Sequence, residues 1–244
     1  MENYAGLAAI YDLMMMGVDY EAWADYVIEA AETFGVKPQC VLDLACGTGS
    51  TTIPLAKHGL TVTGLDLSPA MLAIAKEKAQ KEGVAVSFAE KNMLALDYED
   101  RFDMIVSFQD GINYLTGPGD FEKLAAGVAR GLKEKGVFIF DLNRVDHYSD
   151  SETTVIDLDD PYLVYENQYH EESRIWRIKL TGFVKEGELY RRFEETHEEK
   201  NHDMKEVEAA LLAHHLNIAA VWRIFTKEDA TEKTNRVLVV AKKG

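Results

Sequence analysis

The stretch from Val41 to Gly49 places a carboxylate and two glycines where a ligand could touch the backbone. It reads Val-Leu-Asp-Leu-Ala-Cys-Gly-Thr-Gly, an apolar run that breaks into small residues. The run from Cys40 to Leu44 is too short for a helix and predicts a buried strand. Gly47 and Gly49 can take positive φ and admit close approach of another molecule. The pattern therefore predicts a ligand-binding turn between a strand and a helix.

A second acid follows at the spacing expected of a nucleoside-binding unit. The segment from Ser50 to His58 predicts a helix that ends at Gly59, and the apolar run from Thr61 to Leu65 ends in Asp66. In a β-α-β unit, an acid at the tip of the second strand is placed to accept hydrogen bonds from ribose hydroxyls. We therefore expect a nucleoside-containing cofactor at this turn.

Charge separates the two cofactors that fit such a unit. A dinucleotide brings a pyrophosphate and favours a third glycine, but Thr52 stands three positions after Gly49. Asp43 at the edge of the turn would repel a phosphate and attract a cation. S-adenosylmethionine carries a sulfonium and an ammonium and no phosphate, so it suits the turn. A nicotinamide-dependent oxidoreductase remains the alternative from another enzyme class.

The stretch from Val41 to Gly49, together with Asp66, resembles the first two motifs of the class I S-adenosylmethionine-dependent methyltransferases. The resemblance implies an α/β fold: a doubly wound, seven-stranded, mostly parallel Rossmann-like sheet. It also implies S-adenosylmethionine as the cofactor and methyl transfer as the activity. A catalytically silent protein that binds S-adenosylmethionine is a further alternative.

Residues 1–36 are expected to form an N-terminal helical lid. Members of the family have a Tyr-Asp segment before the nucleotide-binding unit, and Tyr11 with Asp12 resembles it. By that resemblance Tyr11 contacts the cofactor, with simple packing as the alternative. A second helix, from Tyr20 to Phe34, brings Tyr20 and Trp23 near the lid, where both could border the cofactor, with core packing as the alternative for Trp23.

The predicted adenine end follows Asp66. Ser68 can cap a helix that starts at Pro69, so Met71 lies on the first turn and can lean on the adenine. A third strand, from Val84 to Ala89, leads to Asn92, where the family commonly has an acid that accepts from the adenine amino group. An amide oxygen can accept the same bond, and a plain turn residue is the alternative. The full set of expected cofactor contacts is Tyr11, Trp23, Asp43, Ala45, Cys46, Gly47, Gly49, Asp66, Leu67, Met71, Asn92, Met93 and Gln109.

The acceptor is expected at the exit of a fourth strand, Phe102 to Phe108, because ligands of open parallel sheets bind beyond the carboxyl ends of the strands. The catalytic candidates there are Asp110 as a base, Asn113 as an orienting amide and Tyr114 as a second ionisable group. Asp110 could instead bond its own loop. The loop lacks the Asn/Asp-Pro-Pro-Tyr pattern of DNA and protein amide methyltransferases, which disfavours those targets.

We expect a helix from Phe121 to Leu132, then a turn at 133–136 and a strand from Val137 to Asp141. These elements complete a predicted core that spans residues 37–150. Residues 151–200 then alternate apolar and polar side chains with period two, which predicts an antiparallel β insert after strand five. The insert resembles that of the glycine and amino-sugar N-methyltransferase branches, where it roofs the acceptor pocket. This implies a small-molecule acceptor, nitrogen favoured over oxygen. A homodimer surface or a packing elaboration is the alternative, and residues 201–244 return to the core sheet.

Composition limits the partners. Lys and Arg total 26 and Asp and Glu total 42, so the net charge of −16 opposes binding to nucleic acid. No apolar run approaches the roughly 20 residues of a membrane span, and no targeting signal is visible, so a cytoplasmic location is expected. The two cysteines, Cys40 and Cys46, flank one strand and are expected to be reduced. The seven histidines show no metal-ligand spacing, so no metal is expected.

Overall fold

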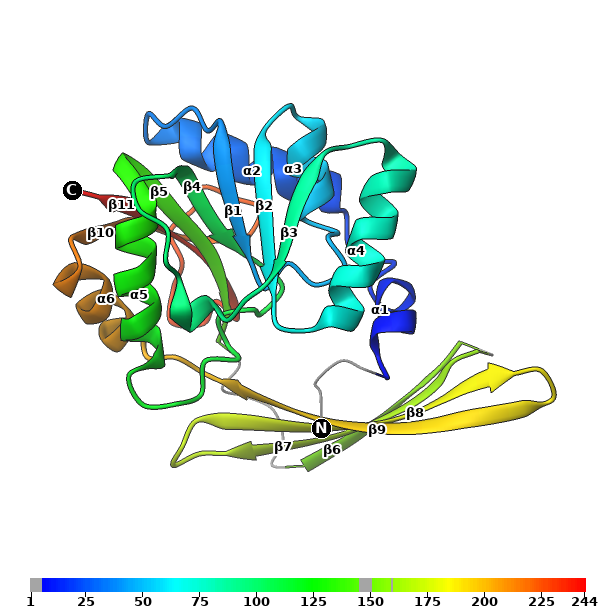
Figure 1. The fold of residues 1–244 in the computed structure, drawn as a ribbon. Coiled ribbons are helices and arrows are strands. Elements are labelled where there is room, and N and C mark those ends of the chain that lie inside the picture. The colour runs from blue at the N-terminus through cyan, green and yellow to red at the C-terminus, as the bar shows by residue number, and fades with distance from the viewer. Residues whose placement is uncertain (1–5, 145–150, 159) are drawn as a thin grey trace.

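The computed structural model describes residues 6–144, 151–158 and 160–244 and is built on a seven-stranded sheet (Figure 1). The strand order is β10-β11-β5-β4-β1-β2-β3, and β11 runs antiparallel to both of its neighbours. The strands are β1 (Cys40–Leu44), β2 (Thr61–Asp66), β3 (Val86–Glu90), β4 (Phe102–Ser107), β5 (Leu132–Asn143), β10 (Leu216–Arg223) and β11 (Arg236–Lys243). This confirms the predicted doubly wound, mostly parallel sheet.

Helices cover both faces of the sheet. The helices are α1 (Ala8–Met14), α2 (Tyr20–Thr33), α3 (Thr52–Lys57), α4 (Pro69–Glu82), α5 (Asp120–Gly131) and α6 (Met204–Ala213), with a 3-10 turn η1 (Met93–Ala95). Successive residues of a strand point to opposite faces. Val41 therefore joins the apolar layer under α2 and α3, whereas Leu42 and Leu44 join the layer under α5 and α6. The two layers fix the height and direction of β1, and with it the turn that follows.

The two helices that border the turn each start at a side-chain cap, of which the sequence analysis predicted only the one at Ser68. The side chain of Asp19 accepts a hydrogen bond from the amide of Ala22 at the start of α2. Ser68 accepts from the amide of Met71 at the start of α4, with Pro69 as the first helical residue. The side-chain oxygens satisfy amides that have no partner within the helix. Each helix therefore begins at a defined position beside the carboxyl ends of the strands.

The segment expected to be a turn, 133–136, is instead part of β5. Leu132 pairs with Phe102 of β4, and the register shifts before Met104 pairs with Val137. Lys133 donates to Asp103 over 2.9 Å, which ties this segment to β4. A bulge absorbs the extra residues, so the chain continues as a strand where the Lys-Glu-Lys-Gly sequence suggested a turn.

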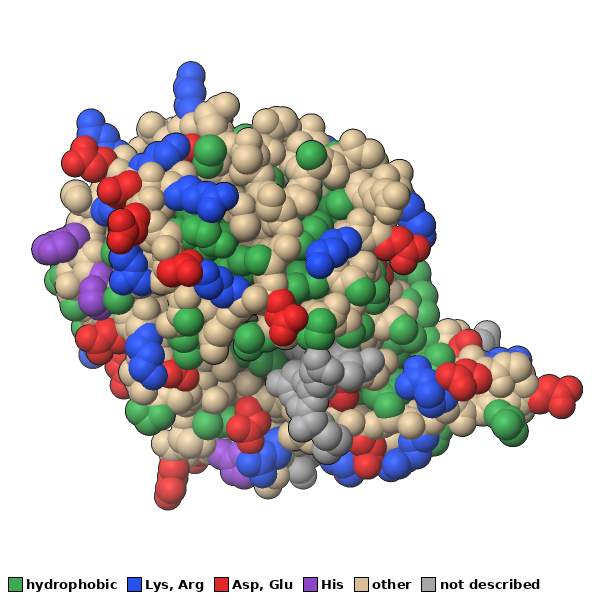
Figure 2. All heavy atoms as spheres, in the orientation of Figure 1, with side chains coloured by type: hydrophobic (Ala, Val, Ile, Leu, Met, Phe, Trp, Pro, Cys, Tyr) green, Lys and Arg blue, Asp and Glu red, His purple; other side chains and the backbone are tan. Residues whose placement is uncertain are grey.

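The insert is a separate four-stranded antiparallel sheet of β6 (Ser151–Asp157), β7 (Tyr162–His170), β8 (Ile175–Glu186) and β9 (Leu189–Lys200). It lies below the carboxyl ends of the parallel strands, with α1 between it and α4 in Figure 1. The expected insert after strand five is therefore present. The face drawn in Figure 2 carries acidic and basic side chains interspersed, without a patch of one sign.

Two searches cover the described part of the chain. No helix among those residues is long and apolar enough to cross a membrane. Within the same residues, no group of three or more histidine, cysteine or acidic side chains could hold a metal ion.

Candidate active site

A cavity of about 360 Å³ lies at the carboxyl ends of β1, β2 and β4. This volume is in the range of small-molecule sites. Five parts of the chain meet in its wall: the turn after β1, the end of β2 with the start of α4, the segment after β3, the exit of β4, and the helices α1 and α2. The lining residues are Tyr11, Tyr20, Ala45, Cys46, Gly47, Thr48, Ser50, Thr51, Asp66, Leu67, Ser68, Met71, Lys91, Met93, Phe108, Gln109, Gly111 and Tyr114.

The turn after β1 needs its glycines for two different reasons. Gly47 has φ +53°, and a Cβ placed on it would meet nothing within 4 Å, so its backbone is open to the cavity. Gly49 has φ +76°, and a Cβ there would lie 3.1 Å from the Cβ of Ala75 in α4. Gly49 therefore lets α4 approach the turn and does not itself line the cavity. Ala45 also has positive φ, 54°, which is unfavourable for a residue with a Cβ.

Asp66 is held by backbone amides at the cavity wall. Its Oδ2 accepts from the amide of Gly47 and its Oδ1 from the amide of Ser68, each over 2.8 Å. Burial raises the pKa of this carboxyl, and the bonds from Ser68 and Gly47 act in the opposite direction. A carboxylate offers about four lone-pair sites, so each oxygen retains capacity for another donor. The orientation is therefore preset for two donors from a ligand.

Asp43 supports the turn from beneath it. Its side chain is 1% exposed, and Oδ2 accepts from the hydroxyls of Thr51 and Thr52 over 2.7 and 2.6 Å. Burial raises its pKa to about 6, against the lowering effect of the two hydroxyls. Oδ1 is buried without a hydrogen-bond partner among the described residues. The structure thus places Asp43 behind the cavity wall, where its charge acts through the turn.

Two further expected contacts lie away from the cavity wall. Trp23 is 4% exposed and packs against Phe108 and Phe225, with ring centroids 5.0 and 4.8 Å away, as a core residue does. Asn92 is exposed and its Oδ1 accepts from the amide of Leu94 over 2.8 Å, which caps η1. The alternatives of core packing for Trp23 and a turn role for Asn92 match these positions. Met93, next to Asn92, does line the cavity.

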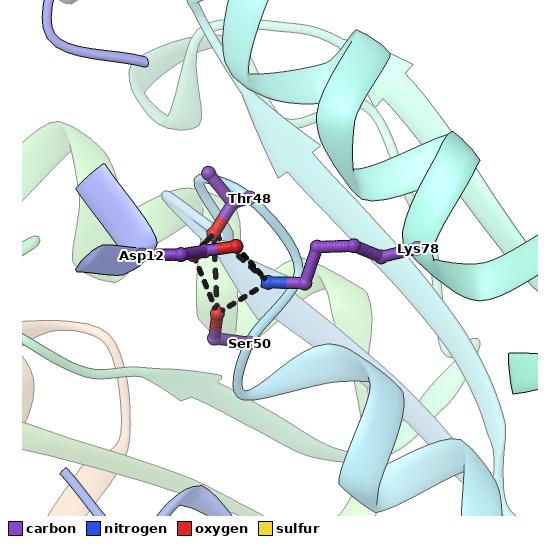
Figure 3. Close-up of polar contacts among 4 residues, drawn as sticks. All are labelled: Asp12, Thr48, Ser50 and Lys78. Carbon is purple, nitrogen blue, oxygen red and sulfur yellow. Dashed lines mark hydrogen bonds and ion pairs between the residues drawn. The ribbon is translucent and has the colours of Figure 1, made fainter. Parts of the chain in front are cut away.

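A polar network fastens α1 onto the turn and α4 (Figure 3). The carboxylate of Asp12 accepts from Thr48 over 2.6 Å and from Ser50 over 3.2 Å. Lys78 of α4 donates to Asp12 and to Ser50, each over 2.7 Å. Because Asp12 is in α1, these bonds hold the helix that carries Tyr11 against the cavity.

Two tyrosines close the cavity on the side of α1 and α2. Burial, together with the charges of Tyr20, Asp110, Asp12 and Asp66, raises the pKa of Tyr11 far above its usual range. Burial raises the pKa of Tyr20 to about 12. Both phenols are therefore neutral hydrogen-bonding groups at ordinary pH.

Behind the exit of β4, three carboxylates surround one arginine. Arg236 of β11 lies 2.8 Å from Asp110 and 2.6 Å from Asp141. The charges of Asp141, Asp110 and Glu199 raise the pKa of Arg236 against the effect of burial. Burial and the charge of Asp110 raise the pKa of Glu199 to about 8. Asp110 itself has φ +66°, a strained backbone that this cluster holds in place.

Asn113 acts as a clamp between the core and the insert. Its Nδ2 donates to the carbonyls of Asn143 and Lys200 over 2.8 and 2.9 Å, and its Oδ1 accepts from the amide of Asn143. The side chain is 1% exposed and is absent from the cavity wall. Both amide hydrogens of Asn113 bond backbone carbonyls and its oxygen accepts from a backbone amide, so these bonds give it a structural role between the core and the insert. Tyr114, one residue on, does line the cavity.

The cavity is also lined by residues that the sequence analysis did not assign to it. The residues in the turn after β1 and at the start of α4 belong to helix starts, and packing decides which way their side chains point. Lys91 follows β3 and is the neighbour of the expected Asn92. The polar ones were signalled only by their polarity in these loops, the other two carried no polar signal, and no spacing rule selects any of them. They are Thr48, Ser50, Thr51, Ser68, Lys91, Phe108 and Gly111.

Comparison with known proteins gives a consistent assignment. Residues 41–136 match the model of a methyltransferase domain family. A Geobacillus protein that is named as a methyltransferase, without a substrate in its name, is 31% identical to this chain. The match covers 99% of this chain and 100% of the Geobacillus protein. A crystal structure of an S-adenosylmethionine-dependent methyltransferase from Clostridium acetobutylicum is 31% identical, covers 99% of both chains and superposes with a TM-score of 0.88.

More distant structures share the fold. An amino pentose methyltransferase from Micromonospora echinaspora, solved with S-adenosylmethionine bound, is 20% identical over 96% of this chain and 97% of its own, with a TM-score of 0.76. At this identity the likeness concerns the arrangement of the sheet and the insert, and it leaves the acceptor open.

Proposed function

Because the chain belongs to the S-adenosylmethionine-dependent methyltransferases, we propose that it transfers the methyl group to a small-molecule acceptor, with nitrogen favoured over oxygen. The observation that supports this most is a single cavity joining the acid at the end of β2 to Tyr114 at the exit of β4. On this proposal the cofactor and the acceptor bind in the same cavity, which Tyr11 of α1 also lines.

The residues of the cavity fit S-adenosylmethionine. Asp66 presents two oxygens with remaining acceptor capacity, as ribose hydroxyls require, and Met71 and Met93 supply an apolar wall for a base. Asp43 adds a buried carboxylate with an unpaired oxygen beneath the turn, which favours a cationic ligand over a phosphate. These residues, with the backbone of Gly47, would hold the cofactor.

The bound cofactor supplies an electrophilic methyl group, so the protein has to place an acceptor lone pair in line and exclude water. Positioning of this kind lowers a barrier by roughly 7 to 11 kcal/mol in favourable cases. The Asp12–Lys78 ion pair holds α1 against α4 beside the turn, and Tyr11 and Tyr20 line the cavity on that side. We propose that this arrangement performs the exclusion of water.

The electrostatics of the cluster behind β4 support a nitrogen acceptor. Asp110 and Asp141 outnumber the single cation of Arg236 beside them, whereas Glu199 is mostly protonated at neutral pH because its pKa is raised to about 8. An excess of carboxylates beside a cavity attracts ammonium groups. Proteins of similar fold include an amino pentose methyltransferase and a sugar N-methyltransferase, so amino sugars are among the acceptors we propose to test. A nucleic-acid acceptor is disfavoured by the net charge of −16.

Two other expectations accompany this proposal. We propose a cytoplasmic location, supported by the two unpaired cysteines, Cys40 and Cys46. A homodimer through the insert remains a prediction that sedimentation of the purified chain would test.

A panel of probes tests the proposed function. The full chain is incubated with S-adenosylmethionine and one acceptor at a time: glucosamine, glycine, ethanolamine or catechol. The release of S-adenosylhomocysteine is followed in each reaction. We expect release with at least one amine at a rate well above that with catechol. Binding of S-adenosylhomocysteine without turnover of any probe would favour the catalytically silent alternative. Thermal stabilisation by NAD and not by S-adenosylhomocysteine would favour the oxidoreductase.

A further inference from the structure

A chain of side chains leads from the cavity into the insert. Tyr114 lines the cavity, and its hydroxyl lies 3.3 Å from Nδ1 of His197 on β9. Nε2 of His197 lies 3.2 Å from Oε2 of Glu195, two residues earlier on the same strand. The side chains of His197 and Glu195 are 6% and 8% exposed. The cavity is therefore connected to a buried imidazole that has a carboxylate behind it.

In this arrangement a carboxylate lies within ion-pair distance of one ring nitrogen, and a phenol lies within hydrogen-bonding distance of the other. A carboxylate on one ring nitrogen fixes the proton there and leaves the other nitrogen as an acceptor. Burying a histidine and a glutamate is costly unless the two are paired, and here the pairing also aims the imidazole at Tyr114. The ring of Tyr114 meets that of His197 edge-on, with centroids 6.0 Å apart.

The carboxylate has a second connection, to the helix that covers the cavity. Oε1 of Glu195 accepts from the amides of Gly6 and Leu7, over 2.7 and 2.9 Å, just before α1. Burial raises the pKa of Glu195, but the bonds from His197, Leu7 and Gly6 outweigh it and the pKa is lowered. Glu195 therefore stays ionised while it holds both the imidazole and the start of α1.

We propose that Tyr114, His197 and Glu195 form a proton relay that takes a proton from a protonated amine acceptor. The N–H bond of the ammonium breaks as its proton passes to the phenol oxygen of Tyr114. The phenol proton passes at the same time to Nδ1 of His197. The acceptor gains a free lone pair, and the imidazolium formed lies beside ionised Glu195. After product leaves, the proton returns to water through the cavity.

In this relay Tyr114 is the catalytic residue, and His197 and Glu195 are positioning residues contributed by the insert. The inference rests on the proposed function, because it requires an amine acceptor. Other titratable groups face the relay from the elements around it. On the same face of the insert or at the adjoining exit of β4 these are Glu199, Tyr165, Tyr169, Glu152 and Asp110, with Tyr11 from α1.

Kinetics over a range of pH separate a relay from a merely structural contact. Release of S-adenosylhomocysteine is measured with the amine probe that the wild-type chain uses, for His197→Gln, Tyr114→Phe, Glu195→Gln and the control Glu194→Gln. We expect kcat to fall by roughly 10²- to 10⁴-fold in the first two variants near neutral pH, with KM changed little. High pH should restore activity, because the acceptor then arrives deprotonated.

The two glutamate variants form a matched pair. Glu195→Gln keeps an oxygen for the amides of Gly6 and Leu7 but removes the charge beside the imidazole, so the acid limb of the rate profile should move to lower pH. Glu194, on the opposite face of β9, pairs with exposed Arg192 and Lys179, and its variant should leave the profile unchanged. An equal loss at every pH for His197→Gln and Tyr114→Phe would overturn the relay.

A measurement without acceptor keeps this inference separate from the proposed function. In nitrogen-15 spectra of the full chain with S-adenosylhomocysteine, the neutral ring of His197 should carry its proton on Nε2, and Tyr114→Phe should shift the Nδ1 resonance. A proton on Nδ1, or no response to Tyr114→Phe, would overturn the relay. Failure of every amine probe with these spectra as expected would instead refute the nitrogen acceptor, and with it the proposed use of the relay.

Discussion

Replacement of Asp66 by alanine should weaken binding of S-adenosylhomocysteine by about 1.5 to 3 kcal/mol. This is the range for hydrogen bonds to a charged group, and it corresponds to a roughly 10- to 150-fold rise in Kd. The magnitude follows from the geometry: both oxygens of Asp66 are anchored by the amides of Gly47 and Ser68 at 2.8 Å. The carboxylate is therefore already oriented before a ligand binds, so little of its energy is spent on ordering.

Isothermal titration calorimetry on folded protein measures the change. Glu90→Ala is the matched control, because Glu90 is the register partner of Asp66 on β3 and is exposed. Its Kd should stay within about twofold of wild type. Asp66→Asn keeps the shape and one acceptor oxygen, so its loss should be smaller than that of Asp66→Ala. A Kd for Asp66→Ala within twofold of wild type, with a cooperative melt, would refute the ribose role.

Three further predictions concern the lid, the acid cluster and the clamp. Lys78→Met should speed dissociation of S-adenosylhomocysteine several-fold in stopped-flow measurements, because α1 loses its bond to α4. Lys81→Met, on the exposed side of α4, is the control. Equal dissociation rates for the two variants would argue against a lid. Glu199→Gln should raise the melting temperature at pH 9 and hardly change it at pH 4.5. The pKa of Glu199 is about 8 in the folded chain against an ordinary 4.5, so the stability of the wild-type chain falls as pH rises between these values. A gain in melting temperature that is independent of pH would contradict this. Asn113→Ala should lower the free energy of unfolding by about 1 to 3 kcal/mol in urea titrations, because it leaves buried backbone groups without partners; an unchanged midpoint would show that Asn113 is no clamp.

The parts of the site that could be predicted from sequence are those built within one β-α-β unit. The turn with Gly47 and the acid Asp66 are joined by a direct hydrogen bond, and their spacing along the chain already implies that meeting. Ser68 and Pro69 mark the start of α4 for the same local reason. Short-range rules of caps, turns and strand ends suffice for these residues.

The rest depends on contacts between distant segments. Arg236 reaches Asp110 across 126 positions of the chain, so the ion pair of Asp110 leaves no local trace. His197 shows no metal-ligand spacing, yet the fold brings it to Tyr114. Asn113 looked like a site residue because of its loop, but its amide bonds the ends of β5 and β9. Pairing between the insert and the core decides these roles, and periodicity within either segment cannot reveal it.

The central claim, methyl transfer to an amine, is tested most directly by following the methyl group itself. S-adenosylmethionine labelled with carbon-13 in its methyl group is incubated with the full chain and the amine probe, and the heteronuclear NMR spectrum of the products is recorded. We expect the label to appear as an N-methyl resonance of the acceptor, in an amount equal to the S-adenosylhomocysteine formed. Label found on oxygen, or S-adenosylhomocysteine formed without any methylated acceptor, would contradict the claim.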